Sequence, residues 1–139
     1  MILDNETLFS DAQAVTATAA STNIIDLAPI GAGIVRDIGP GKAIPVVVQV
    51  VTDFTAAGSA TMVVALQTDD NSSFSSAKTV VQTAAIPVAD LKAGYQFYLD
   101  WVPRGTNERF VRLNYTVATG PMTAGAVTAG ITVGHQTNG

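Results

Sequence analysis

The chain contains no cysteine, which excludes disulfide bonds and thiolate metal sites and agrees with a reducing cytoplasm. Charged residues make up only 13% of the sequence, whereas soluble domains usually carry about 25%. Seven basic residues stand against eleven acidic ones, for a net charge of −4. Because phosphate binding needs clustered Lys and Arg, we expect no direct contact with nucleic acid.

Long hydrophobic runs are also missing. The longest, residues 43–51, is interrupted by Pro45 and Gln49 and is about half of the roughly 20 residues that a membrane helix requires. Residues 1–6 are acidic where a signal peptide would be basic. The sequence therefore predicts no membrane partner.

Groups that carry catalysis are scarce. The single histidine, His135, lies in a polar tail, and no Gly-x-Ser-x-Gly motif accompanies it. Asp69 and Asp70 lack the spacing of a calcium loop and are more typical of a turn. The only glutamates are Glu6 and Glu108. We expect no enzyme activity, no cofactor and no metal site.

Hydrophobic residues, in contrast, reach 47% of the chain. With so little charge, the surface must consist mainly of Ala, Thr, Val, Ser and Gly, which protect poorly against association. Such a surface is a liability for a lone monomer and not for a subunit packed against partners. The composition thus favours a structural assembly protein.

β-branched residues dominate, and strand-like runs alternate with Gly, Asp, Asn and Pro. Eight strands are predicted: Gln13–Thr18, Thr22–Leu27, Ala43–Thr52, Ala60–Thr68, Ala77–Thr83, Gly94–Val102, Arg109–Ala118 and Ala126–Gly134. Their spacing indicates an all-β, antiparallel, eight-stranded sandwich or barrel. We place this domain at residues 13–134, after an extended N-terminal arm at 1–12 and before a flexible tail at 135–139.

A period of two predicts which side chains face the core. The inward sets are Val111, Leu113, Tyr115 and Val117; Val127, Ala129, Ile131 and Val133; and Met62, Val64 and Leu66. Two strands, 43–52 and 94–102, are apolar on both faces, which is typical of a strand between two layers or beneath a partner. We expect at least one of them to touch another subunit.

The N-terminal arm carries Leu3, Leu8 and Phe9 between polar residues. Its irregular pattern does not indicate a core strand. The arm either folds back to close its own sandwich or docks on a neighbouring subunit.

The few arginines are the other interface candidates, because the guanidinium binds carboxylates and carbonyls while its stem packs on apolar surface. They are Arg36, Arg104, Arg109 and Arg112. The alternative is an intramolecular pair, for instance Arg109 with Glu108 or Asp100, which contributes little to stability when exposed.

Several runs, taken in order, resemble the capsid cement (decoration) proteins of short-tailed bacteriophages. These runs are residues 1–6, 9–16, 58–61, 66–70, 74–76, 103–105, 112–117 and 125–130. The resemblance implies a jelly-roll fold and a non-enzymatic virion protein on the outer capsid surface, made in the host cytoplasm. It also implies binding to the major capsid protein, stabilisation of the expanded shell against DNA pressure, and a homodimer, with a trimer as the alternative.

A different function on the same kind of sandwich is a carbohydrate- or receptor-binding module, since jelly rolls often bind sugars through exposed aromatic side chains. The candidates here are Tyr95, Tyr98, Trp101 and Tyr115. Most of them occupy alternating strand positions, where the core is the default location. A sandwich hydrolase is the weakest alternative, because the catalytic groups are so few.

Overall fold

The computed structural model describes residues 3–99 and 102–133 as an all-β domain. A short 3-10 helix, η1 (Asn5–Thr7), precedes the strands. The strands are β1 (Leu8–Ala14), β2 (Ala19–Ala20), β3 (Ile25–Asp26), β4 (Val46–Ala56), β5 (Thr61–Asp69), β6 (Lys78–Gln82), β7 (Ile86–Pro87), β8 (Gln96–Leu99), β9 (Phe110–Ala118) and β10 (Met122–Ile131).

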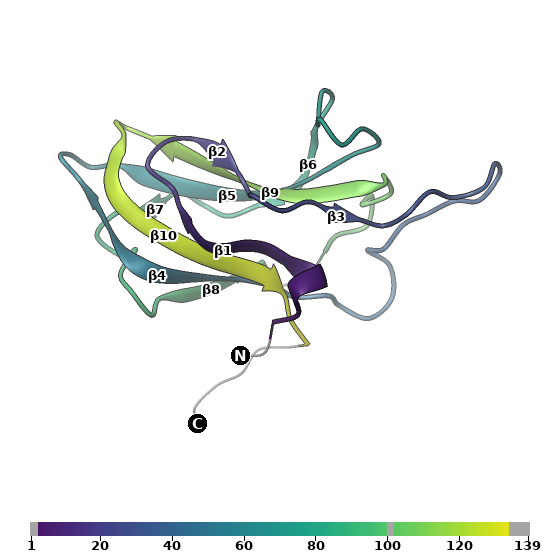
Figure 1. The fold of residues 1–139 in the computed structure, drawn as a ribbon, viewed down its shortest axis with the longest axis horizontal. Helices are drawn as coiled ribbons and strands as arrows, with labels where there is room; N and C mark the ends of the chain where they lie inside the picture. Colours follow the sequence, from purple (N-terminus) through teal and green to yellow (C-terminus); the bar gives the residue numbers. More distant parts are fainter. Residues whose placement is uncertain (1–2, 100–101, 134–139) are drawn as a thin grey trace.

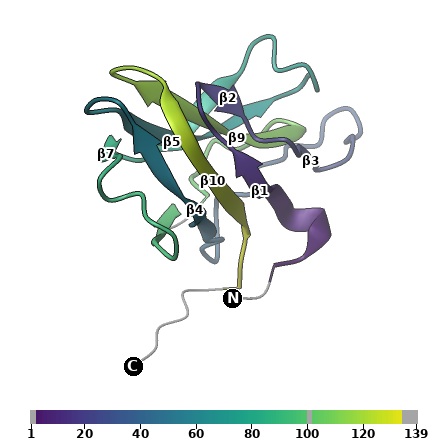
Figure 2. The ribbon, with the colours of Figure 1, turned by 60° about the vertical axis from the view of Figure 1, so that its left-hand side comes forward.

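The strands form two antiparallel sheets packed face to face (Figures 1 and 2). One has the order β1-β10-β4-β8, and the other has the order β2-β9-β5-β6, with β3 also pairing with β9 and β7 with β5. This arrangement confirms the predicted all-β sandwich of the jelly-roll class. The described residues contain ten strands rather than eight, because the short strands β2 and β7 were not predicted. The segment predicted at 13–18 overlaps only the end of β1, and the segment predicted at 22–27 is reduced to β3.

The core lies between the two sheets. As predicted, the inward faces of β5 and β9 carry Met62, Val64, Leu66, Val111, Leu113 and Tyr115, all of them buried. Val127 and Ala129 of β10 are buried as well, but Val133 is 99% exposed. The prediction for Val133 is wrong because β10 ends at Ile131, and beyond the last pairing the alternation no longer fixes which way a side chain points.

The N-terminal boundary also differs from the prediction. Residues 8–12 belong to β1, which pairs with β10, and Phe9 is fully buried in the core. The period of two is hidden in the sequence because the β1–β10 register shifts twice, between Leu8 and Ser10 and between Ser10 and Gln13. An arm covering residues 1–12 is therefore wrong: of the two alternatives, the segment closes its own sandwich. The predicted tail at 135–139 lies outside the described residues.

Candidate interaction surface

One end of the sandwich, here called the loop end, gathers the long connections of the chain. Asp26 of β3 and Asp69 of β5 both pair with Phe110, the first residue of β9. The segments 27–45, 70–77 and 102–109 therefore start or finish side by side. In Figure 1 the segment after β3 extends beyond this end of the two sheets.

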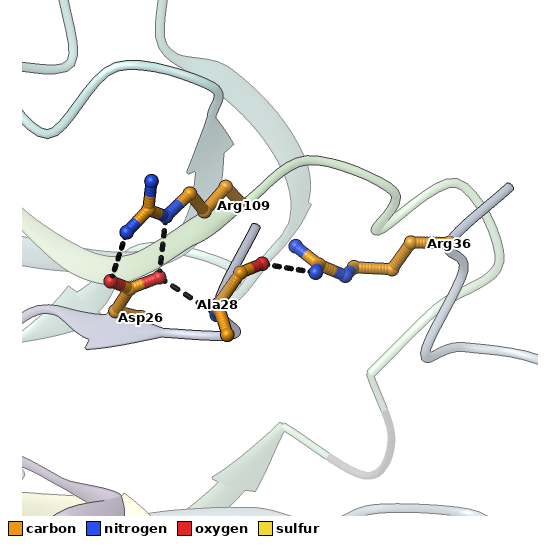
Figure 3. A network of polar contacts seen from close by, with 4 residues as sticks. All are labelled: Asp26, Ala28, Arg36 and Arg109. Carbon is orange, nitrogen blue, oxygen red and sulfur yellow. Dashed lines mark hydrogen bonds and ion pairs between the residues drawn. The ribbon is translucent and has the colours of Figure 1, made fainter. Parts of the chain in front are cut away.

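Two arginines and one aspartate form a network at the loop end (Figure 3). Arg109 binds Asp26 through two hydrogen bonds, Nε to Oδ1 at 2.8 Å and Nη2 to Oδ2 at 2.7 Å. Asp26 Oδ1 also accepts the backbone N–H of Ala28 at 2.8 Å, and Arg36 donates to the Ala28 carbonyl. The Arg109 bond, aided by Ala28, lowers the pKa of Asp26 to about 2. Arg109 thus has an intramolecular partner, Asp26 rather than Glu108, while Asp100 lies outside the described residues.

The carboxylate of Asp37 braces the base of the same loop. It accepts backbone N–H groups from Gly39 at 3.0 Å and from Gly105 at 2.9 Å, and these bonds lower its pKa. Ile38 adds a backbone bond to the carbonyl of Thr106 at 3.2 Å. A Cβ at Gly39 would overlap the carbonyl oxygen of Pro103, so only glycine lets the two segments approach so closely.

The Asp69 carboxylate organises the turn after β5. It accepts N–H groups from Asn71 at 2.9 Å and from Ser76 at 2.8 Å, and the hydroxyl of Ser76. These hydrogen bonds lower the pKa of Asp69. The predicted turn is confirmed. No group of three or more His, Cys, Asp or Glu that could hold a metal ion occurs within residues 3–99 and 102–133.

Arg112, two residues into β9, is engaged within the chain. Its Nε donates to Gln67 Oε1 at 2.9 Å, and its guanidinium lies 4.2 Å from the ring centroid of Phe74. Arg104 differs: it is exposed and makes no side-chain hydrogen bond or ion pair to any described residue. Its charge adds to the hydrogen bonds from Gly105 and Gly39 in lowering the pKa of Asp37.

A partly buried carboxylate, that of Glu108, also lies at the loop end. Glu108 Oε2 is inaccessible to solvent and has no hydrogen-bond partner among the described residues. Burial, together with the nearby charges of Asp70 and Asp69, raises the pKa of Glu108. A group of this kind destabilises the fold when ionised.

The N-terminal residues reach the same end along the outer face of the four-stranded sheet. Leu8 pairs with Gly130 and Gly130 with Val47, which gives a row across β1, β10 and β4. A Cβ on Gly130 would lie 3.1 Å from Leu3 Cδ2, so Leu3 sits directly over this glycine. Val47 is fully buried although it lies outside the core cluster. The second apolar face of β4 is therefore covered at this point by the chain's own N-terminal segment.

An open hollow lies between this segment and residues 22–24, which directly precede β3. It has a volume of about 400 Å³ and is lined by Asn5, Glu6, Leu8, Thr22, Asn23 and Ile24. Most of these side chains are polar. The hollow supplies no catalytic group beyond the single carboxylate of Glu6.

The predicted site residues thus gather at the loop end, and all but one of them are at least partly exposed to solvent. Phe9 is in the core and is unavailable to a partner. The segment 28–35 was not predicted to belong to this surface, although its Ile30, Ile34 and Val35 are 46%, 62% and 89% exposed. The signal was present in the sequence as an unbroken run without a single polar side chain.

The sequence matches a known protein family. A protein-family model described as Bbp16 aligns with residues 9–131, from β1 to the end of β10. No curated protein matches the chain. Within the residues that the structure describes, no helix is long and apolar enough to cross a membrane.

Proposed function

The chain belongs to the phage-associated Bbp16 family, and from this premise we propose that it is a structural virion protein that cements the capsid. In this proposal it binds the outer surface of the expanded shell and bridges neighbouring major capsid protein subunits. It acts without catalysis and without a cofactor, and it associates as a homodimer, with a trimer as the alternative.

The observation that carries the proposal is the loop end. A rigid two-layer sandwich holds Leu3, Leu8, Arg36, Arg104, Arg109 and Arg112 toward one end, beside an exposed apolar loop. Several of these side chains are fixed by their own hydrogen bonds, so little entropy is lost when a partner covers them. A surface of this kind is suited to binding a large, fixed protein lattice.

Cementing requires interface area and rigidity rather than a reactive group. A protein that binds only the assembled, expanded lattice stabilises it by mass action. A subunit that contacts two or more shell subunits at once gains effective affinity, because the second contact is intramolecular. Packaged DNA that presses outward on the shell must then also break these contacts.

The carbohydrate-binding alternative loses one candidate, because Tyr115 is fully buried and its hydroxyl lies 2.7 Å from Ser10 Oγ. Tyr95 is 40% exposed and its ring centroid lies 5.8 Å from that of Phe97. Trp101 lies outside the described residues. No specific feature of the described surface favours a sugar site.

The test is co-sedimentation of the purified chain with mature shells stripped of it, made from the major capsid protein of the same phage. We expect saturable binding at a fixed ratio to the major capsid protein, and none to unexpanded shells. Absence of binding to mature shells would overturn the proposal, and glycan arrays would then examine the alternative. Sedimentation velocity of the free chain checks the dimer.

A further inference from the structure

The residues Ala28–Val35, here called the loop tip, form an exposed apolar projection. Their sequence, Ala-Pro-Ile-Gly-Ala-Gly-Ile-Val, contains no charged or hydrogen-bonding side chain, and every residue is exposed. Val35 is 89% exposed and Ile34 62%. Isolated exposed apolar residues are ordinary, but a contiguous group on a projecting loop marks an interaction site.

The loop tip is held in place at its base. Arg36, directly after the tip, donates to the carbonyl of Ala28 at its start and so joins its two ends. The carboxylate of Asp37 accepts the N–H of Gly105, which holds the chain after the tip to the 102–109 segment. Within the tip, the N–H of Ile34 bonds the carbonyl of Gly31 at 3.2 Å. The projection is thus preorganised, and a partner does not bear the full entropic cost of ordering it.

Basic residues flank the loop tip. Arg36 follows it directly, and Lys42 lies on the segment that leads from the loop tip to β4. Arg104 lies on the segment that Gly39 contacts. We call these three residues the basic collar. Three of the seven basic residues of a chain with net charge −4 thus lie on the segments next to the loop tip, where the carboxylates are Asp26 and Asp37. The collar therefore suits a partner surface with carboxylates around an apolar site.

We propose that the loop tip inserts into an apolar depression rimmed by carboxylates on the major capsid protein, with Ile34 and Val35 as anchors and the basic collar facing the rim. This inference rests on the proposed function and names the chemistry of its contact. Burial of two β-branched side chains in such a depression supplies affinity, and the charges select the orientation.

Two other occupants fit the chemistry less well. A second copy of the chain offers, among the described residues, a hollow lined mainly by polar groups such as Asn5, Glu6, Thr22 and Asn23. A lipid surface is usually met by Trp or Phe anchors and by clusters of four to eight basic residues. The loop tip has no aromatic residue, and the collar has only three cations.

The test uses the full chain and stripped mature shells. The double variant I34S/V35S removes the anchors, and Val51→Ser, at a 38% exposed position on β4, is the matched control. We expect the double variant to bind shells at least about tenfold more weakly, because two aliphatic side chains no longer lose their contact with water on binding, and we expect the control to bind like wild type. The charge variant R104E/K42E should weaken binding and reduce its salt dependence, whereas Lys92→Glu should not.

The outcomes separate the two proposals. Wild-type affinity of I34S/V35S, in a chain that does bind shells, overturns the loop-tip contact and leaves the cement function standing. Failure of the wild-type chain to bind shells overturns both. The loop-tip contact is also overturned if I34S/V35S changes self-association in sedimentation velocity, or if the tip drives flotation with vesicles of anionic phospholipid while shell binding is unchanged. Unaltered thermal unfolding of the variants confirms that they fold.

Discussion

The two ends of the sandwich are built differently. At the end opposite the loop end, short turns carry the chain between the sheets: residues 57–60 join β4 to β5, and residues 119–121 join β9 to β10. Thr119 and Gly120 both have positive φ, 63° and 99°, as a tight turn requires. At the loop end, residues 27–45 join β3 to β4 as one long excursion. A few residues are enough to close the fold at the opposite end, so the length of the 27–45 connection is not needed for closure and is available for the contacts that we propose.

We expect the largest loss of stability from a substitution in β1, the strand that the sequence did not predict, because its Phe9 is fully buried. Phe9→Ala removes a fully buried ring from the core and should lower the free energy of unfolding by about 3–5 kcal/mol. Urea denaturation measures this loss. Asp4→Ala, before β1, is the control and should cost far less. A small effect of Phe9→Ala would show that the strand behaves as the detachable arm that the sequence suggested.

A pair of glycine variants compares the two ends directly. Gly39→Ala forces the loop base away from Pro103, whereas Gly120→Ala strains only the tight turn at φ 99°. Each should cost about 1–3 kcal/mol of stability, but only Gly39→Ala should also weaken shell binding. Equal binding by both variants would mean that the braced geometry of the loop is irrelevant to recognition. Thermal unfolding and co-sedimentation on the same samples give both readouts.

Acid should loosen the loop end before the opposite end. The pKa values of Asp26, Asp37 and Asp69 are lowered by hydrogen bonds in the folded state, so their stabilisation is present above the unfolded pKa near 3.8 and is lost as the pH falls through the folded values. Amide hydrogen exchange followed from about pH 5 down to about pH 2 should show Gly105 and Ser76 losing protection, relative to the opposite end, as the pH falls below 3.8 toward the lowered pKa values of their carboxylate acceptors. Uniform loss of protection along the chain would contradict the prediction.

The smallest effect has the opposite sign. Because the pKa of Glu108 is raised in the folded chain, its ionisation destabilises the fold as the pH rises through the unfolded pKa toward the folded one. Glu108→Gln should therefore raise the melting temperature slightly at pH 7 and leave it unchanged at pH 3. Glu6→Gln, on the exposed N-terminal helix η1, serves as control. A lower melting temperature at pH 7 would mean that Glu108 has a stabilising partner.

The sequence predicted the class of fold and the faces of β5 and β9, because an uninterrupted period of two translates directly into burial. It failed at β1, where two register shifts hide that period, and at Val133, where pairing has ended. For the candidate interaction surface, the sequence indicated which residues to consider but not which partners they have in the fold. Arginines could be nominated from their scarcity, but Asp26, which lies far from Arg109 in the sequence, becomes its partner only through the β3–β9 pairing.

The hydrogen bond between Ser10 and Tyr115 has a mechanical consequence. Ser10 belongs to β1 in one sheet and Tyr115 to β9 in the other, and their hydroxyl oxygens lie 2.7 Å apart inside the core. A tension applied to the N-terminal end runs along β1 and loads its ladder with β10 in shear, because the hydrogen bonds of an antiparallel ladder are perpendicular to the strands. Two register shifts interrupt this ladder. The buried hydroxyl pair passes part of that force to the second sheet. In the shell that we propose, a pull on β1 would therefore be carried by both sheets and not by β10 alone.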